Sequence, residues 1–416
     1  MESNEVVATS GFLSQVGPPQ ILWVWALDMI IVMIASGAYS LFVDRTRRDR
    51  LAQALCVGFC VAYLCLYALF QTGTPGIITY PLLTILNDQH WLLFPMLIWS
   101  LANDMFTISE AKRLFALLGV SALLGGIAGN GITTLSARFL SSSSTGSTHL
   151  LLLNAGLLAA MALGLRLSLR RIQITARQSR AGEKVLDTLR EGIAFVQQVP
   201  SYRYLTLAMI LLGIGLNVVE YQMVASAAGA YTQVTGLETF FATVRTIRIV
   251  LMFVVQGLLS GWLLKQLEFK RIFIIMPVAL LCGLLLGMAV PTLVGAVIAQ
   301  VLTRTTLEGI DEPSRRAFLG LVPDERRGRV SAFVEGYLYP LGSIVSCGMI
   351  GLFLTAAHHN LLDPVLARAL YMGVGCICAI VALISIFRFR AHYDTSMLNW
   401  RLKRRQRSSV ISKLEF

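Results

Sequence analysis

The stretch RLSLRRIQITARQSRAGEKVLDTLREGIAFVQQVPSYR (166–203) is a long basic interruption between two apolar parts of the chain. Five apolar stretches lie before it and six lie after it. Each is close to the roughly 20 residues with which a helix crosses the hydrocarbon layer of a bilayer. The position of this linker therefore predicts two membrane-embedded helical bundles, of five and six spans.

The eleven apolar stretches are predicted to be helices, because a chain exposed to lipid must satisfy its backbone hydrogen bonds internally. Only Pro291-Thr292 separates the eighth stretch from the ninth, which predicts a tight helical hairpin. The expected fold is an all-α integral membrane protein with about 11 transmembrane helices. The stretches are 21–43, 51–71, 82–102, 113–135, 149–169, 203–225, 240–262, 272–290, 291–310, 332–355 and 365–388.

Composition excludes the soluble classes of protein. The 416 residues are 56 % hydrophobic and only 14 % charged, with a mean hydropathy of +0.68, whereas a soluble domain carries about 25 % charged residues. The seven cysteines all lie in apolar stretches, which favours packing roles over disulfides or metal ligands. The chain has no P-loop, catalytic triad or H-E-x-x-H pattern, so it is predicted not to be an enzyme and to hold no cofactor or metal.

The distribution of basic residues predicts how the chain sits in the membrane. A net charge of +12 would suggest a nucleic-acid partner in a soluble protein. Here 31 of the 35 Lys and Arg residues fall in alternate loops, the linker and the tail from residue 388, and residues 1–20 and 72–90 have none. The positive-inside rule then predicts a cytoplasmic C-terminus and an N-terminus outside. The expected partner is the lipid bilayer and not nucleic acid.

Similar charged loops recur six helices apart. DRTRRDR (44–50) follows the first span and KQLEFKR (265–271) follows the seventh, a spacing typical of two parallel six-helix repeats, the major facilitator architecture. In that register the first of the usual twelve helices is missing, because residues 1–20 are short and polar. The expected parts are a non-cytoplasmic segment 1–20, a first bundle 21–169, a basic linker 170–202 with a surface amphipathic helix, a second bundle 203–388 and a basic cytoplasmic tail 389–416.

Three stretches resemble one family of membrane proteins. They are WSLANDMFTISEAKRLFALLGVSALLGGIAG (99–129), with its tryptophan, N-D-x-F loop, E-A-K-R and glycine-rich helix, GFLSQVGPPQILWVWALDMIIVMIASGAYSLFVDR (11–45) and NVVEYQMVASAAGAY (217–231). The family is that of the ATP/ADP translocases, nucleotide transporters of plastids and intracellular bacteria, with their wider bacterial relatives. The second and third stretches resemble its second helix and the end of its seventh.

The resemblance implies a secondary transporter that moves or exchanges a nucleotide-like anion. It also implies a multi-pass protein of the bacterial inner (cytoplasmic) membrane. In relatives, a basic tail such as this one can lead into a soluble regulatory domain. A regulatory soluble domain or protein at the C-terminal side is therefore a further expected partner.

Ionisable side chains inside spans are costly, so they are functional candidates by default. Arg245 and Arg248 lie on one face of the seventh span, and a planar guanidinium suits a phosphate or carboxylate group. Glu220, at a similar depth on the sixth span, is expected to hold one of these arginines until an organic anion displaces it. The substrate-binding candidates are Arg245, Arg248, Glu220, Tyr221, Gln222, Asp28, Arg304 and Glu308.

Simpler roles stay open for several of these residues. Arg304 and Glu308, four residues apart, have the spacing of a structural ion pair near a helix end. Asp28 has the alternative role of a buried hydrogen-bond partner for a neighbouring helix. Tyr221 has the alternative role of an ordinary aromatic belt residue.

Acidic residues among the basic loops suggest ion pairs that form and break as one bundle rocks against the other. Anchoring by the positive-inside rule explains the basic residues but not these acids. The gating candidates are Asp44, Arg45, Arg48, Asp104, Glu110, Lys112, Arg113, Asp311, Arg315 and Arg316. The leading function is alternating-access transport of a phosphorylated, nucleotide-like anion. The alternatives are transport of another organic anion or a lipid, and a sensor or scaffold that does not transport.

Overall fold

The computed structural model of the chain is helical wherever it has regular structure. It describes residues 2–43, 48–105, 121, 124–136, 146–168, 193, 194, 196, 197, 199–256, 269–319, 330 and 333–411. The described residues contain no strand. The predicted all-α fold is therefore confirmed.

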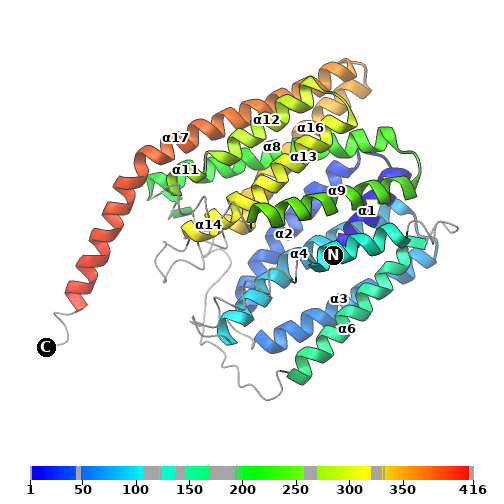
Figure 1. Cartoon of the computed structure of the whole chain (residues 1–416), viewed down its shortest axis with the longest axis horizontal. Coiled ribbons are helices and arrows are strands. Elements are labelled where there is room, and N and C mark those ends of the chain that lie inside the picture. Colours follow the sequence, from blue (N-terminus) through cyan, green and yellow to red (C-terminus); the bar gives the residue numbers. More distant parts are fainter. Residues whose placement is uncertain are drawn as a thin grey trace.

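Two sets of helices are separated by the linker. Before it lie α1 (Glu2–Gln15), α2 (Ile21–Val43), α3 (Arg48–Gln71), α4 (Gly76–Met105), the helical residues 124–136, the 3₁₀ helix η1 (Gly146–His149) and α6 (Leu150–Ser168). After it lie α8 (Pro200–Ala230), α9 (Val234–Val254), α11 (Phe269–Ile272), α12 (Ile275–Ala289), α13 (Leu293–Thr306), α14 (Glu312–Leu319), α16 (Tyr339–His358) and α17 (Pro364–Ile411). Two π-helical turns, η4 (Leu307–Asp311) and η5 (Val334–Leu338), precede α14 and α16. Figure 1 shows the long helices lying side by side.

Each of the eleven predicted stretches contains a described helix. Seven helical segments are long and apolar enough to cross a membrane; α4 and α9 are more polar, and α12 is apolar but shorter. The predicted hairpin is present, since α12 ends at Ala289 and α13 begins at Leu293. The Thr292 hydroxyl caps α13 by accepting a hydrogen bond from the Gly295 amide at 3.4 Å.

α1 fills the gap that the sequence pattern leaves at the start of the first bundle. The prediction that residues 1–20 supply no first helix was wrong for residues 2–15, which form a buried helix shorter than a full span. One of its polar side chains finds a partner on α6: the Asn154 amide donates to Asn4 at 2.6 Å. Val6 belongs to the apolar core shared with the second half, and Val7 to a separate core of the first half. α1 therefore lies between the two sets of helices.

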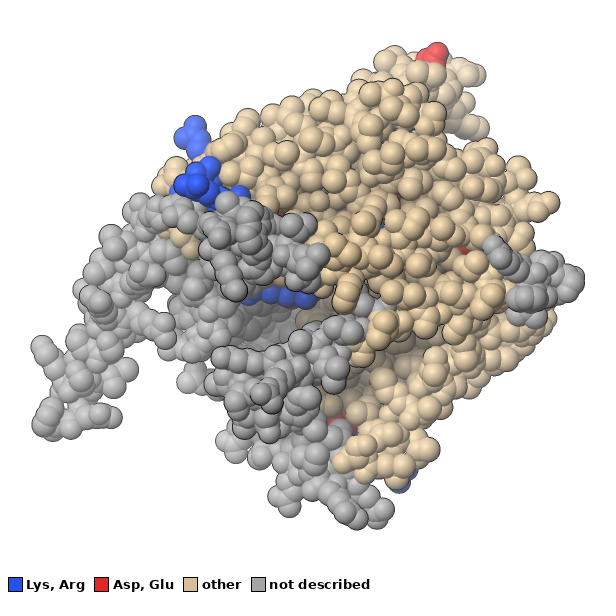
Figure 2. Space-filling view, viewed as in Figure 1, with Lys and Arg blue, Asp and Glu red and all other residues tan. Residues whose placement is uncertain are grey.

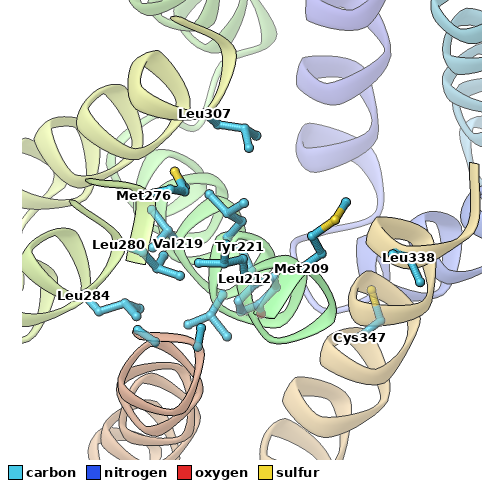
Figure 3. Close-up of a cluster of buried hydrophobic side chains, with 14 of the residues drawn as sticks. Met209, Leu212, Val219, Tyr221, Met276, Leu280, Leu284, Leu307, Leu338 and Cys347 are labelled. Carbon is cyan, nitrogen blue, oxygen red and sulfur yellow. The ribbon is translucent and has the colours of Figure 1, made fainter. Parts of the chain in front are cut away.

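α8 lies at the centre of the larger apolar core. In the most apolar 18-residue stretch of this helix, 78 % is buried. It crosses α16 closely: a Cβ on Gly342 would stand 2.4 Å from the Ile210 carbonyl oxygen. Glycine at this position allows the two backbones to approach. Figure 3 shows side chains of α8 with those of α12, α16 and the π turns; labelled are Met209, Leu212, Val219, Tyr221, Met276, Leu280, Leu284, Leu307, Leu338 and Cys347.

The outer surface is apolar, as a lipid-facing protein requires. Leu352, Val294 and Leu157 are 67 %, 65 % and 60 % exposed. In Figure 2 the described part of this face is almost wholly uncharged, and basic side chains gather toward the end where α11 and α14 lie. α11 and α14 belong to 263–271 and 304–329, two of the loops that the sequence predicts to be cytoplasmic.

The C-terminal helix extends far beyond the apolar part of the chain. α17 runs for 48 residues, about 70 Å at 1.5 Å per residue, whereas the hydrocarbon layer is about 30 Å thick. The tail 389–416 thus begins as a direct continuation of a span. Its predicted position on anionic lipid stays a prediction, and most of the predicted amphipathic linker helix lies outside the described residues.

Candidate functional site

Three arginines of the second half lie largely inside the protein, and each pairs with a carboxylate from another helical segment. Arg245 and Arg248 come from α9, and Arg304 comes from α13. Their acidic partners are Glu2, Glu5, Glu220 and Glu308. These seven residues are called the charge cluster below.

Arg245 of α9 forms ion pairs with α1. Its side chain is 10 % exposed and lies 3.5 Å from the Glu2 carboxylate, and it also pairs with Glu5. Glu2 and Glu5 stand one helical turn apart, so both carboxylates reach the same guanidinium. The charge of Arg245 is thus met by two acids from a helix that the sequence pattern did not predict.

Arg248 lies one turn along α9 and pairs with Glu308 at 3.7 Å. Glu308 belongs to the π turn η4, and the Gln256 amide donates to its backbone carbonyl at 3.1 Å. Such turns are rare inside helices and recur at functional sites. Glu308 thus forms its ion pair with Arg248, whereas it acts on Arg304, four residues away in the chain, electrostatically.

Arg304 pairs with Glu220 of α8 at 3.0 Å. The Gln300 amide donates to the same carboxylate oxygen at 3.3 Å, and Tyr339 of α16 lies next to the guanidinium. The expectation that Glu220 holds an arginine of α9 was therefore wrong: its direct partner comes from α13. Arg245 and Arg248 still act on Glu220 electrostatically.

Arg245, Arg304 and Glu220 lie well inside the helical segments that carry them, since α13 runs on through η4 into α14 as one segment, Leu293–Arg316. Arg245 and Arg304 are the twelfth residues of α9 and α13, about 16 Å from the start of each helix. Glu220 lies ten residues before the end of α8, about 15 Å from it. In a layer about 30 Å thick these positions are close to the midplane, too deep for the arginines to reach the interface easily.

Tyr221 and Gln222 face a different helix from Glu220. The Tyr371 hydroxyl of α17 donates to the Gln222 amide oxygen at 2.6 Å, and the Tyr221 and Tyr371 rings meet edge to face at 5.9 Å. Successive residues point about 100° apart around a helix. The structure therefore does not bring these two candidates to the arginines.

Asp28 lies in the first half, on α2. It is fully buried, and the Gln89 amide of α4 donates to it at 3.4 Å. Asp88 of α4 interacts with it electrostatically. Asp28 is thus a buried hydrogen-bond partner for a neighbouring helix, and Glu5 of the charge cluster acts on it electrostatically.

The gating candidates are described only in part. Arg315 pairs with Asp311 at 2.7 Å within one helical turn, and Arg316 lies 3.4 Å from Glu312 and 3.6 Å from Glu335. The pair with Glu335 joins α14 to η5. Arg48 lies on α3 and Asp104 lies on α4; the structure describes the backbone of these two residues but not their side chains. Asp44, Arg45, Glu110, Lys112 and Arg113 lie outside the described residues.

Sequence reasoning missed Glu2, Glu5 and Asp88. The signal available for the first two was a pair of acids three residues apart in a segment without basic residues. Asp88 lies within a predicted span, as Asp28 does, and the same rule would have selected it. Among the described residues no group of His, Cys, Asp and Glu has the arrangement of a metal site.

Two comparisons relate this geometry to known proteins. The TLC ATP/ADP transporter family matches residues 79–306, more than half of the chain and a range that holds all three arginines of the cluster. No curated protein sequence matches the chain.

Solved structures show the fold. The nucleoside transporter NupG is 15 % identical, with a TM-score of 0.58 over 94 % of this chain and 97 % of that chain. A D-xylose-proton symporter is 13 % identical, with a TM-score of 0.63 over 92 % of this chain and 94 % of that chain. A POT family transporter in complex with 5-aminolevulinic acid is 13 % identical, with a TM-score of 0.63 over 92 % of each chain. These likenesses confirm the predicted major facilitator architecture.

Proposed function

Because this chain belongs to the TLC ATP/ADP transporter family and has the fold of a multi-pass secondary transporter, we propose that it moves a phosphorylated, nucleotide-like organic anion. The proposed mechanism is alternating access, in which the two sets of helices rock around a central site. We further propose that the membrane is the bacterial inner membrane and that the C-terminal tail faces the cytoplasm.

The observation that carries the proposal is the charge cluster itself. Three guanidinium groups near the midplane are expensive to bury, and a membrane protein retains such groups where they bind something. A guanidinium donates two parallel hydrogen bonds to a pair of anionic oxygens, which suits a phosphate group. A nucleotide phosphate is therefore the ligand chemistry that these residues fit best.

The carboxylates give the cluster a second state. Glu5 and Glu220 occupy guanidinium groups that an arriving anion needs. Each is also within electrostatic reach of the other two arginines. Exchange of a carboxylate for a phosphate keeps every arginine paired, so binding and release avoid an uncompensated buried charge. Because Glu5 belongs to α1 and Arg245 to α9, this exchange alters a contact between the two sets of helices.

Ligand-dependent thermal stabilisation of purified variants tests the proposal. The ligands are ATP, ADP, adenosine and inorganic phosphate. Arg248→Ala is expected to weaken ATP binding about ten- to a hundred-fold, as the loss of about 1.5–3 kcal/mol implies. Arg248→Lys restores only part of it, because lysine lacks the planar fork. Glu220→Gln is expected to raise ATP affinity, since a competing charge is removed.

The matched control is Arg368→Ala. Arg368 donates to the Gly287 carbonyl at 3.1 Å, away from the cluster, so its loss leaves ATP affinity unchanged. Equal ATP binding by the wild type, Arg245→Ala and Arg248→Ala would show that these arginines only pair internally. Stabilisation by adenosine equal to that by ATP would contradict phosphate recognition.

A further inference from the structure

The helical residues 124–136 of the first half, called helix 124–136 below, have one apolar face and one polar face. Leu124, Ile132 and Leu135 are exposed, as side chains that meet lipid are. Asn130 and Thr133, on the other side of the helix, are fully buried. The helix therefore directs an amide group into the protein.

The buried face of helix 124–136 meets the charge cluster at Glu2. A Cβ on Gly126 would stand 3.7 Å from Cγ of Glu2 and 3.0 Å from Cδ1 of Ile249 on α9, the helix that carries two arginines of the cluster. A Cβ on Gly129 would stand 3.8 Å from Cβ of Glu2. Asn130 follows Gly129 directly and lies on the same face as Gly126, about 6 Å further along the helix. Asn130 is therefore a close neighbour of the charge cluster.

The amide group of Asn130 has no bonding role among the described residues. Both its nitrogen and its oxygen are buried, and neither has a hydrogen-bond partner there. An unpaired buried polar group costs free energy, and no water is present in the hydrocarbon layer to lower this cost. Polar side chains that are retained at such depth mark substrate pathways. The unpaired amide thus points to a ligand that completes its hydrogen bonds.

Asn87 of α4 is the other described amide whose two polar atoms are both buried and unpaired. It shares a helix face with Leu83 and Phe94, which belong to the separate apolar core of the first half. The contacts of Gly126 and Gly129, by contrast, place Asn130 beside the charge cluster. Of the two amides, Asn130 is therefore the one next to an anion held by the arginines.

The chemistry of an amide selects the part of the substrate that it can bind. Its nitrogen is a donor and its oxygen is an acceptor. An ionised phosphate offers acceptors only, so it leaves the amide oxygen of Asn130 unpaired. Adenine presents an amino donor beside a ring-nitrogen acceptor, and an asparagine matches that edge with two hydrogen bonds. A purine with a carbonyl oxygen in place of the amino group, such as guanine, presents two acceptors at the same edge.

We infer that Asn130 recognises the base of the transported nucleotide and selects adenine, while the arginines of the charge cluster hold the phosphates. This inference rests on the proposed function, because it assigns the residue that recognises the uncharged part of the same substrate. The amide is neutral, so this contact adds specificity without another buried charge. A carbonyl purine loses affinity because it leaves the buried amide oxygen facing an acceptor.

Thermal stabilisation titrations of the purified full chain with ATP, inosine triphosphate and tripolyphosphate test the inference. Inosine triphosphate has a carbonyl oxygen where ATP has the amino group, and tripolyphosphate lacks both base and sugar. The wild type is expected to bind ATP about ten- to a hundred-fold more tightly than inosine triphosphate, as the loss of one bidentate pair implies. Asn130→Leu should bind ATP as weakly as inosine triphosphate, with its affinity for tripolyphosphate unchanged.

Thr133→Val is the matched control. Thr133 lies on the same helix face and is as deeply buried as Asn130, but its hydroxyl already donates to the Gly129 carbonyl at 2.9 Å. Thr133→Val should therefore keep the preference for ATP. A preference for ATP that survives in Asn130→Leu, or that is absent in the wild type, would overturn the inference.

The stability of the ligand-free protein separates binding from a structural role. Leucine is close to asparagine in size but has no polar atoms, so Asn130→Leu removes an unpaired buried group and should unfold at the same or a higher temperature than the wild type. A lower unfolding temperature together with an unchanged preference for ATP would show that the amide is structural.

Adenosine separates this inference from the proposed function. Stabilisation by adenosine that Asn130→Leu loses would support base recognition even if the wild type binds neither ATP nor tripolyphosphate, and phosphate recognition alone would then fail. Binding of tripolyphosphate, with equal affinities for ATP and inosine triphosphate, would support phosphate recognition and overturn base recognition. If none of the four ligands stabilises the wild type, both fail.

Discussion

Ser36 of α2 and Gly336 of η5 touch across the two halves of the chain, with the Ser36 hydroxyl oxygen 2.2 Å from where a Cβ on Gly336 would stand. A Cβ at position 336 would press against the Ser36 side chain, so a larger residue fits there only if that side chain moves. Gly336 also belongs to a π turn whose Glu335 pairs with Arg316. If the two halves rock as proposed, this contact is a place where a gap would open or close.

A disulfide across this contact should stop transport. The double variant Ser36→Cys/Gly336→Cys is expected to lose uptake after mild oxidation and to recover it after reduction. Ser36→Cys and Gly336→Cys alone control for the seven native cysteines. Transport that continues after complete cross-linking, measured on a gel, would show that α2 and η5 do not separate during the cycle.

Removal of Arg304 should cost far more stability than removal of an exposed arginine. Arg304→Ala leaves Glu220 buried without its direct partner, and breaking a buried pair in this way costs about 3–5 kcal/mol. Arg316→Ala is the control, because that side chain is 63 % exposed and its surface pairs contribute at most about 1 kcal/mol. Unfolding of the purified variants in denaturant measures both. Similar losses in the two variants would contradict the role of burial.

The double variant Arg304→Met/Glu220→Met separates pairing from packing. Replacing both partners with apolar residues removes the unpaired charge, so this variant should be more stable than Arg304→Ala alone. It should nevertheless fail to bind ATP. Recovery of stability without recovery of binding would mark the pair as functional and not merely structural.

Tyr371→Phe should weaken the fold slightly and leave ATP affinity unchanged. The change removes one hydrogen bond to Gln222, worth about 0.5–1.5 kcal/mol. Because Gln222 faces α17 and Glu220 faces α13, the loss should not reach the charge cluster. Thermal unfolding of this variant measures the change in stability, and ATP titration of the same variant measures its ATP affinity. A marked loss of ATP affinity would indicate that Tyr221 and Gln222 contribute to substrate binding after all.

The predicted orientation can be tested at two single cysteines. Asn360 lies in the turn between α16 and α17 and has a positive φ of 56°, whereas Val410 lies in the basic tail. Asn360→Cys is expected to react with a membrane-impermeant maleimide in intact cells, and Val410→Cys only after lysis. The reverse result would invert the topology drawn from the basic loops.

The parts of the fold that local sequence pattern governs could be predicted. Length and hydropathy place the spans, and Pro291-Thr292 marks the hairpin, because both signals come from residues close together in the chain. α1 could not be predicted this way. Residues 1–20 are too short and too polar to predict a span, and the partners that make burial tolerable are up to 240 residues away.

The site was predictable in its residue types but not in its pairings. Arg245, Arg248, Arg304, Glu220 and Glu308 all stand out as charges inside spans. Their partners depend on how helices face each other and on the π turn at Glu308, which no spacing rule for an α-helix contains. A sequence thus shows which charged residues lie inside spans, whereas the residues that pair with them depend on the tertiary structure.

The contact between α1 and α9 also sets an order for folding during synthesis. α1 is made before α9, and Glu5 can meet Arg245 only when 240 further residues have been made. Until then a 14-residue helix with two acids has neither the length nor the hydropathy to stay in the bilayer alone. α1 must therefore wait near the interface and enter the protein late, after α9 has inserted.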